Sequence, residues 1–170
     1  DNPLAYSNQP RTISEVMNSK QITDDLRILD CSRSCSGSSS ILLASEKIAK
    51  TISDQPIWIK GIGQKTTSAS FTKNVLEEIE STRIAANSAY RMAKIESKNI
   101  DVAEVHDAFS VCELMAISEL GLVTNDKSGE FVRDLFNTEN RMISPRGGLI
   151  GAGHPLGATG ISQTIEITSQ

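Results

Sequence analysis

The spacing of hydrophobic residues changes several times along the chain, between the short runs typical of strands and the three-to-four-residue spacing of helices. Short apolar runs predict strands at 41–44, 57–62 and 100–106, the first of them buried. Helical spacing predicts helices over 14–19, 45–50, about 75–95, 109–120 and from about 158 to the end. Strands and helices in alternation, with unusual residues in the loops between them, predict a layered α/β fold.

Local signals mark the ends of some of these elements. Ser14 is the candidate N-cap of the first helix, and Gly121 stands where a left-handed residue would end the helix at 109–120. Residues 64–73 form a Ser/Thr-rich loop, and residues 124–146 form a polar stretch before a glycine-rich segment. The last helix has no C-cap and no strand after it, so we expect the sheet to end unfinished unless a partner completes it.

Composition narrows the classes of function. With 38% hydrophobic and 22% charged residues, the balance is that of an ordinary soluble protein. An aromatic content of 4% and a net charge of −4 argue against a surface for nucleic acid. No apolar run approaches the roughly 20 residues needed to cross a bilayer, and the N-terminal residues lack the layout of a signal peptide. We therefore expect a cytoplasmic protein that binds neither nucleic acid nor membrane.

The three cysteines, Cys31, Cys35 and Cys112, favour neither a disulfide framework nor a metal site. An odd count without a secretion signal is poor support for disulfides. Cys31 and Cys35 resemble half of a zinc site, but no second pair follows, so we expect no metal. Cys31 and Cys112 fit small buried apolar positions.

The chain has two histidines, and both stand in unusual settings. His106 ends a predicted strand directly before a helix, where α/β sheets place their active sites. His154 lies in segment 147–160, whose six glycines let the backbone approach a ligand closely. Two converging histidines can hold the oxygen of a thioester carbonyl as negative charge develops on it.

Plainer interpretations of both settings stay open. A histidine at the end of a strand is as often the partner of a backbone group. Glycine-rich segments more often form turns or bind phosphates at helix N-termini. The segment follows neither the P-loop pattern nor the dinucleotide-binding pattern, which argues against a nucleotide site of either kind.

Residues 147–160 resemble the G-G-x-x-x-x-G-H-P-x-G-A-[ST]-G signature of thiolases. Residues 106–109, His-Asp-Ala-Phe, resemble a motif that reads Asn-Glu-Ala-Phe in most thiolases and His-Asp-x-Phe in the sterol-carrier-protein-type and archaeal-type branch. Residues 56–63 and 101–106 also resemble archaeal-type thiolases. The resemblance implies a thiolase-like layered α-β-α fold, with 1–55 ending the N-terminal domain and 56–170 forming a C-terminal domain without its final strands.

The resemblance also implies roles for individual residues. His154 would activate the nucleophilic cysteine and help to bind the thioester oxygen, and His106 would replace the asparagine that orients a water in the oxyanion hole. The implied contacts to the acyl chain or to coenzyme A are Phe109, Ser32, Gly153 and Gly157. Ser32 would contact the pantetheine arm, although residues 36–39 read Ser-Gly-Ser-Ser where thiolases usually have Asp-Gly-Ala-Ala.

Both catalytic cysteines of the family are expected elsewhere. The nucleophile lies in an earlier region than this sequence covers, and none of the three cysteines matches it. The second lies in a final strand or in a His-Asp-Cys-Phe form of the motif, where this sequence has Ala108. We therefore expect the 170 residues alone to be inactive.

The resemblance implies an acyltransferase that joins or cleaves acyl-CoA units through an acyl-cysteine, in lipid metabolism and the mevalonate pathway. Coenzyme A thioesters would be the substrates, with no separate cofactor. Such enzymes are homo-oligomers, and some associate with a hydroxymethylglutaryl-CoA synthase and a small zinc-ribbon/OB-fold protein. Two alternatives remain: a thiolase-like aldolase acting on CoA esters, whose relatives tend to replace these histidines with tyrosines, and a non-catalytic assembly subunit that needs a partner chain.

Overall fold

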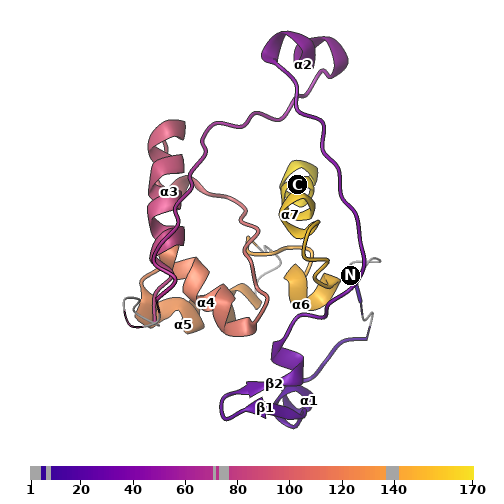
Figure 1. The fold of residues 1–170 in the computed structure, drawn as a ribbon, viewed down its shortest axis with the longest axis vertical. Helices are drawn as coiled ribbons and strands as arrows, with labels where there is room; N and C mark the ends of the chain where they lie inside the picture. The colour runs from indigo at the N-terminus through magenta and orange to yellow at the C-terminus, as the bar shows by residue number, and fades with distance from the viewer. Residues whose placement is uncertain (1–4, 7–8, 71, 73–76, 137–141) are drawn as a thin grey trace.

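The computed structural model describes residues 5–6, 9–70, 72, 77–136 and 142–170 (Figure 1). The chain is helix-rich with one small sheet. Its α-helices are α1 (Ile13–Met17), α2 (Glu46–Ile52), α3 (Glu80–Ala93), α4 (Ser110–Glu119), α5 (Ser128–Phe136), α6 (Gly148–Ala152) and α7 (Thr159–Ser169). Its strands are β1 (Gln21–Thr23) and β2 (Leu26–Arg27), and short 3-10 turns lie at Ile28–Asp30, Ser97–Asn99 and Asn125–Lys127.

The N-cap of the first helix lies two residues earlier than predicted. Thr12, not Ser14, is its N-cap: the Glu15 N–H donates to Thr12 Oγ1 at 3.1 Å, and the Thr12 N–H donates to Glu15 Oε2 at 2.7 Å. This reciprocal capping box satisfies two backbone donors, which a cap at Ser14 would leave open. The antiparallel hairpin β1–β2 follows directly.

The hydrophobic core lies around α4. Its buried residues are Val105, Ala116, Ile117 and Ile143. Helices α3 and α5 pack against α4 (Figure 1). The predicted helix at 109–120 is confirmed, and Gly121 adopts the predicted left-handed conformation with φ of +71°. The final helix is confirmed as α7 and the brief helix near 45–50 as α2.

Helices α3 and α5 differ from the prediction. The helix expected over 75–95 is shorter: residues 75–76 lie outside the described residues, and α3 begins only at Glu80 because the Ile79 N–H donates instead to Glu119 Oε1 at 3.1 Å. Helix α5 forms within the polar stretch 124–146. It is stabilised by Phe131, Val132 and Leu135, which pack against the core.

The predicted strands at 41–44 and 57–62 are wrong as hydrogen-bonded strands. Both segments run extended on either side of α2 (Figure 1), and within the described residues neither is assigned to a strand. Leu42 is 80% exposed and Ile57 is 64% exposed, so these segments are not buried either. A strand is stable only beside a neighbour that pairs with its backbone. The strand predicted at 100–106 is reduced to one parallel bridge between Ala103 and Ile143.

The second extended segment lies directly against α3. A Cβ atom on Gly61 would overlap the carbonyl oxygen of Ala89, and one on Gly63 would overlap that of Ala85. Only glycine allows the two backbones to approach this closely. The segment therefore has a fixed place on the helix although it pairs with no strand in the described part of the chain.

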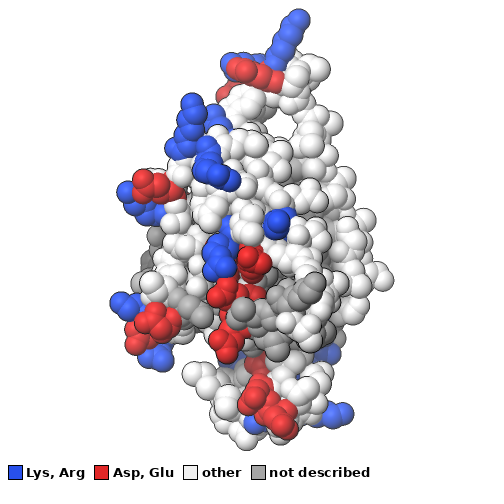
Figure 2. All heavy atoms as spheres, turned by 60° about the vertical axis from the view of Figure 1, so that its left-hand side comes forward, with Lys and Arg blue, Asp and Glu red and all other residues white. Residues whose placement is uncertain are grey.

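Charged side chains of both signs share the surface. In Figure 2 lysine and arginine are spread over the whole height of the view, whereas aspartate and glutamate lie mainly in its lower half. Among the described residues, no helix has the length and apolar character that a membrane span requires.

Candidate functional site

The two histidines lie together. The imidazole rings of His106 and His154 meet edge to face, with their centroids 4.9 Å apart and their planes at 80°. His106 precedes α4, and His154 follows α6 after the single residue Gly153. Two loops that are far apart in the sequence thus bring their histidines to one place.

Segment 31–34 joins these two loops. Cys31 forms an antiparallel bridge with Phe109, and Ser34 forms a parallel bridge with His154. The Ser32 N–H donates to the Ala108 carbonyl at 2.9 Å, and the His154 N–H donates to the Arg33 carbonyl at 2.7 Å. Because its backbone bonds to both histidine loops, this segment fixes one loop relative to the other.

A hydroxyl group lies beside one ring nitrogen of His154. Thr159 Oγ1 lies 2.7 Å from His154 Nδ1 and 3.1 Å from the Pro155 carbonyl oxygen. A hydroxyl has one hydrogen to donate, so when that hydrogen goes to the Pro155 carbonyl, Nδ1–H of His154 is the donor to Thr159. In that tautomer the lone pair of the neutral ring is on Nε2, so Nε2 can accept a proton.

His106 is held toward its neutral form. Loss of surrounding water lowers the pKa of His106, the neighbouring His154 lowers it further, and the Asp107 carboxylate opposes both. A neutral imidazole both donates and accepts a hydrogen bond. A neutral His106 can therefore donate a hydrogen bond to a substrate oxygen while it places no positive charge next to His154.

Three carboxyl groups close to His106 in the sequence, those of Glu104, Asp107 and Glu113, influence one another electrostatically. Asp107 is 2% exposed and accepts hydrogen bonds from the Leu149 and Ile150 N–H groups, at 2.7 and 3.4 Å. Burial raises the pKa of Glu104 to about 7, with further repulsion from Glu166 and Asp107 and an opposing effect of Arg146. Burial, and then Asp107, raise the pKa of Glu113 to about 7.

The sequence analysis missed Asp107, Glu104, Glu113 and Thr159 as site residues. Asp107 and Thr159 lie within the two motifs quoted above, and the two glutamates lie on either side of His106 in the sequence. Their closeness to the motifs could have marked them as candidates.

The other predicted site residues lie on the two histidine loops or on segment 31–34. Phe109 is 43% exposed. Gly153 is buried and has φ of +93°. It lies beside Cys35, since a Cβ on Gly153 would be 2.9 Å from the Cys35 sulfur. Gly157 lines a groove of about 520 Å³ between the serine-rich loop 36–39 and residues 155–158. The roles assigned to these residues, to Ser32 and to both histidines stay predictions.

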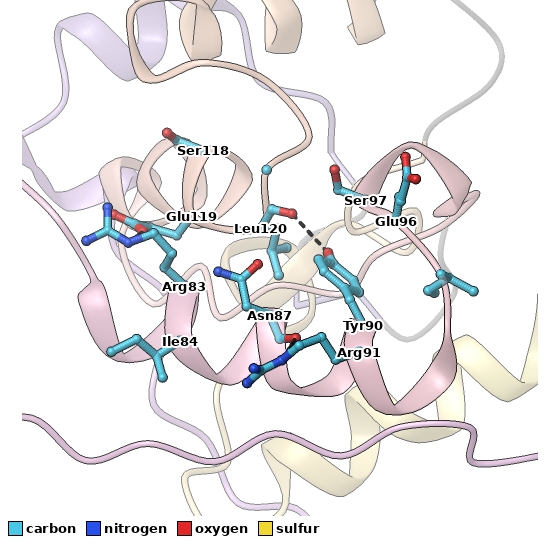
Figure 3. Close-up of a pocket in the computed structure, with 12 residues that line it drawn as sticks. Arg83, Ile84, Asn87, Tyr90, Arg91, Glu96, Ser97, Ser118, Glu119 and Leu120 are labelled. Carbon is cyan, nitrogen blue, oxygen red and sulfur yellow. Dashed lines mark hydrogen bonds and ion pairs between the residues drawn. The ribbon is translucent and has the colours of Figure 1, made fainter.

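A larger groove of about 810 Å³ lies between α3 and the end of α4 (Figure 3). In it the Tyr90 hydroxyl donates to the Leu120 carbonyl at 2.9 Å, and Arg83 lies 2.8 Å from Glu78 and 3.7 Å from Glu119. The groove contains no histidine or cysteine, and its Arg83 is already paired with acids. The described residues contain no group of three or more side chains that could hold a metal ion. Among the described residues, the histidine pair therefore stays the candidate site.

Known proteins match the whole chain. The family model described as "Thiolase C-terminal domain-like" matches residues 61–170. The acetyl-CoA acetyltransferase of Methanothermobacter thermautotrophicus is 36% identical over 173 residues, which is 100% of this chain and 45% of that protein. Sterol carrier protein 2 of Gallus gallus is 32% identical over 178 residues, which is 100% of this chain and 32% of that protein. The chain thus spans less than half the length of these curated relatives.

A solved structure shares the fold. The "Ltp2-ChsH2(DUF35) aldolase" matches with a TM-score of 0.82 over 97% of this chain and 45% of that chain, at 20% identity. This confirms the predicted thiolase-like α/β fold class, although the 41–44 and 57–62 segments are unpaired. Because the family model covers well over half of the residues, the chain belongs to the thiolase family and carries its C-terminal domain.

Proposed function

We propose that this chain forms part of a thiolase that catalyses Claisen condensation or thiolysis of acyl-CoA, with two acetyl-CoA molecules giving acetoacetyl-CoA. The observation that carries the proposal is the edge-to-face contact of His106 and His154. We propose that Thr159 Oγ1 accepts from Nδ1–H of His154, which leaves Nε2 to accept a proton. The acetyl-CoA acetyltransferases among the relatives support this reaction over others.

In this mechanism His154 Nε2 removes the proton of a cysteine thiol, and the thiolate attacks the thioester carbonyl of acetyl-CoA. The C–S bond to coenzyme A then breaks, which leaves the acyl group on the cysteine, and the departing CoA thiolate takes the proton back from His154. His106 then stabilises the oxyanion directly or through a water. One such donor is worth about 3 kcal/mol in the transition state. The mechanism requires both imidazoles at one reacting carbon, which their 4.9 Å separation allows.

The nucleophilic cysteine is proposed to come from outside these 170 residues. Burial, and then the charge of Asp30, raise the pKa of Cys31, which disfavours the reactive thiolate. The exposed apolar segments beside α2 support the need for a further region that covers them. We call the complete enzyme this chain together with the region that supplies the cysteine, on one polypeptide or in a complex.

Several finer features belong to the same proposal. Coenzyme A thioesters would be the substrates, with no separate cofactor, in the cytoplasm and in the mevalonate pathway. A homo-oligomer is proposed, together with association with a hydroxymethylglutaryl-CoA synthase and a zinc-ribbon/OB-fold protein. The aldolase alternative is weaker because both active-site positions are histidine here, and the aldolase neighbour at 20% identity informs only the fold.

The test is thiolysis of acetoacetyl-CoA by the complete enzyme. His154→Ala should reduce the rate about a hundredfold or more, because the base and one oxyanion donor are lost together. Thr168→Ala is the matched control, since Thr168 is exposed on α7 and bonds only to a carbonyl of its own helix. An unchanged rate for His154→Ala, or robust turnover by the 170 residues alone, would overturn the proposal.

A further inference from the structure

The Asp107 carboxylate caps the start of helix α6. Oδ1 accepts from the Leu149 N–H at 2.7 Å, and Oδ2 accepts more weakly from the Ile150 N–H at 3.4 Å. These N–H groups belong to the first turn, where a helix has no internal acceptors for them. The carboxylate is buried, and bonds between a charged acceptor and N–H groups in such a place are strong.

Gly148 leaves the space that this carboxylate occupies. A Cβ atom on Gly148 would overlap Oδ2 of Asp107 and would stand 2.5 Å from its Cγ. Gly148 also has φ of +61°, a conformation that residues with a side chain rarely adopt. The Asp107 carboxylate therefore occupies the space in which a side chain at position 148 would lie.

Helix α6 depends on such outside contacts for its position. It has five residues, far fewer than a helix needs to be stable by itself. The Tyr6 N–H donates to the Gly151 carbonyl near its far end, at 2.8 Å, and Asp107 holds its beginning. A movement of α6 would carry His154 with it, because only Gly153 separates that histidine from the helix.

We infer that Asp107 and Gly148 are positioning residues that set the separation of the His106 and His154 imidazoles. Asp107 directly follows His106, and its carboxylate accepts hydrogen bonds from the first turn of α6. Helix α6 in turn directly precedes the His154 loop. This buried contact thus gives a second link between the two histidine loops, besides the one through segment 31–34. The inference deepens the proposed function and rests on it for its catalytic meaning, but the geometry can be tested without activity.

The experiment uses the full 170-residue chain labelled with ¹³C,¹⁵N-histidine and with ¹³C-methyl isoleucine. Because the chain has two histidines, two sets of ring signals are expected. Wild type should show nuclear Overhauser cross-peaks between the two rings. Asp107→Asn and Gly148→Ala should lose these cross-peaks. Gly151→Ala should keep them, since a Cβ on Gly151 would meet nothing within 4 Å in the same helix.

Each outcome decides the inference. Inter-ring cross-peaks that persist in Asp107→Asn and Gly148→Ala would overturn it. The methyl signals of Ile117, fully buried in the core, report on the rest of the fold. Their loss in both variants would show that Asp107 holds the whole domain, which would also overturn the inference. If the complete enzyme lacks thiolysis but the cross-peaks behave as expected, the proposed function fails and the positioning of the rings stands.

Discussion

The Thr159 hydroxyl lies 2.7 Å from Nδ1 of His154 while it donates to the Pro155 carbonyl, and Thr159 is almost fully buried. A threonine at the start of α7 thus holds the imidazole at Nδ1. The proposed mechanism needs the tautomer with its hydrogen on Nδ1, in which Nε2 is the nitrogen that acts as the base.

Replacing this hydroxyl should separate catalysis from folding. Thr159→Val keeps the volume but removes the acceptor, so either ring nitrogen can carry the hydrogen. We expect the thiolysis kcat of the complete enzyme to fall about a hundredfold, the scale of general-base catalysis. Thr159→Ser keeps the hydroxyl and should stay close to wild type. Equal rates for the valine and serine variants would show that the hydroxyl does not control His154.

The buried glutamates predict how stability depends on pH. The pKa of Glu104 and of Glu113 is about 7 in the folded chain, against an ordinary 4.5. The folded state therefore binds these protons more tightly than the unfolded state, so their contribution to the free energy of unfolding is full below about pH 4.5 and is lost as the pH rises through about 7. Urea unfolding across this range measures the slope.

Glu113→Gln should reduce this fall in stability, because a glutamine is uncharged throughout. Glu130→Gln, at an exposed position on α5, is the control and should leave the slope as in wild type. A Glu113→Gln variant whose stability falls as steeply with pH as the wild type would contradict the assignment of a raised pKa to Glu113.

The close contact between segment 57–63 and α3 predicts a large effect of one methyl group. Gly61→Ala would press a Cβ atom against the Ala89 carbonyl, and we expect the free energy of unfolding to fall by about 1–3 kcal/mol. Gly129→Ala is the control: a Cβ there meets nothing within 4 Å, and alanine should stabilise helix α5 by about 0.5–1 kcal/mol. Urea midpoints that rank Gly61→Ala at or above wild type would show that the segment does not pack there.

Sequence reasoning succeeded where the determinants are local. The helical spacing near Ala116 and the glycine at 121 predicted α4 and its end. The capping box at Thr12 was also readable, since Thr12 and Glu15 have the required spacing, but Ser14 was preferred. Helix α5 was missed because its polar residues outnumber Phe131, Val132 and Leu135, the apolar residues that face the core.

Features that depend on distant contacts could not be predicted in the same way. The apolar run at 41–44 indicates an extended segment, but whether it pairs depends on a neighbour that the run itself does not specify. The convergence of His106 and His154 was expected from the family resemblance, not from their spacing. The bonds from Leu149 and Ile150 to Asp107 depend on how α6 is placed, which no local pattern encodes.

The most direct measurement for the account as a whole is a double-mutant cycle on the complete enzyme, with thiolysis of acetoacetyl-CoA as the rate. His106→Ala and His154→Ala are made singly and together. If the two imidazoles act on one thioester, each single change lowers kcat/KM strongly, and the double variant loses much less than the product of the two single effects. Single variants with unchanged rates, or losses that multiply independently, would contradict a shared site.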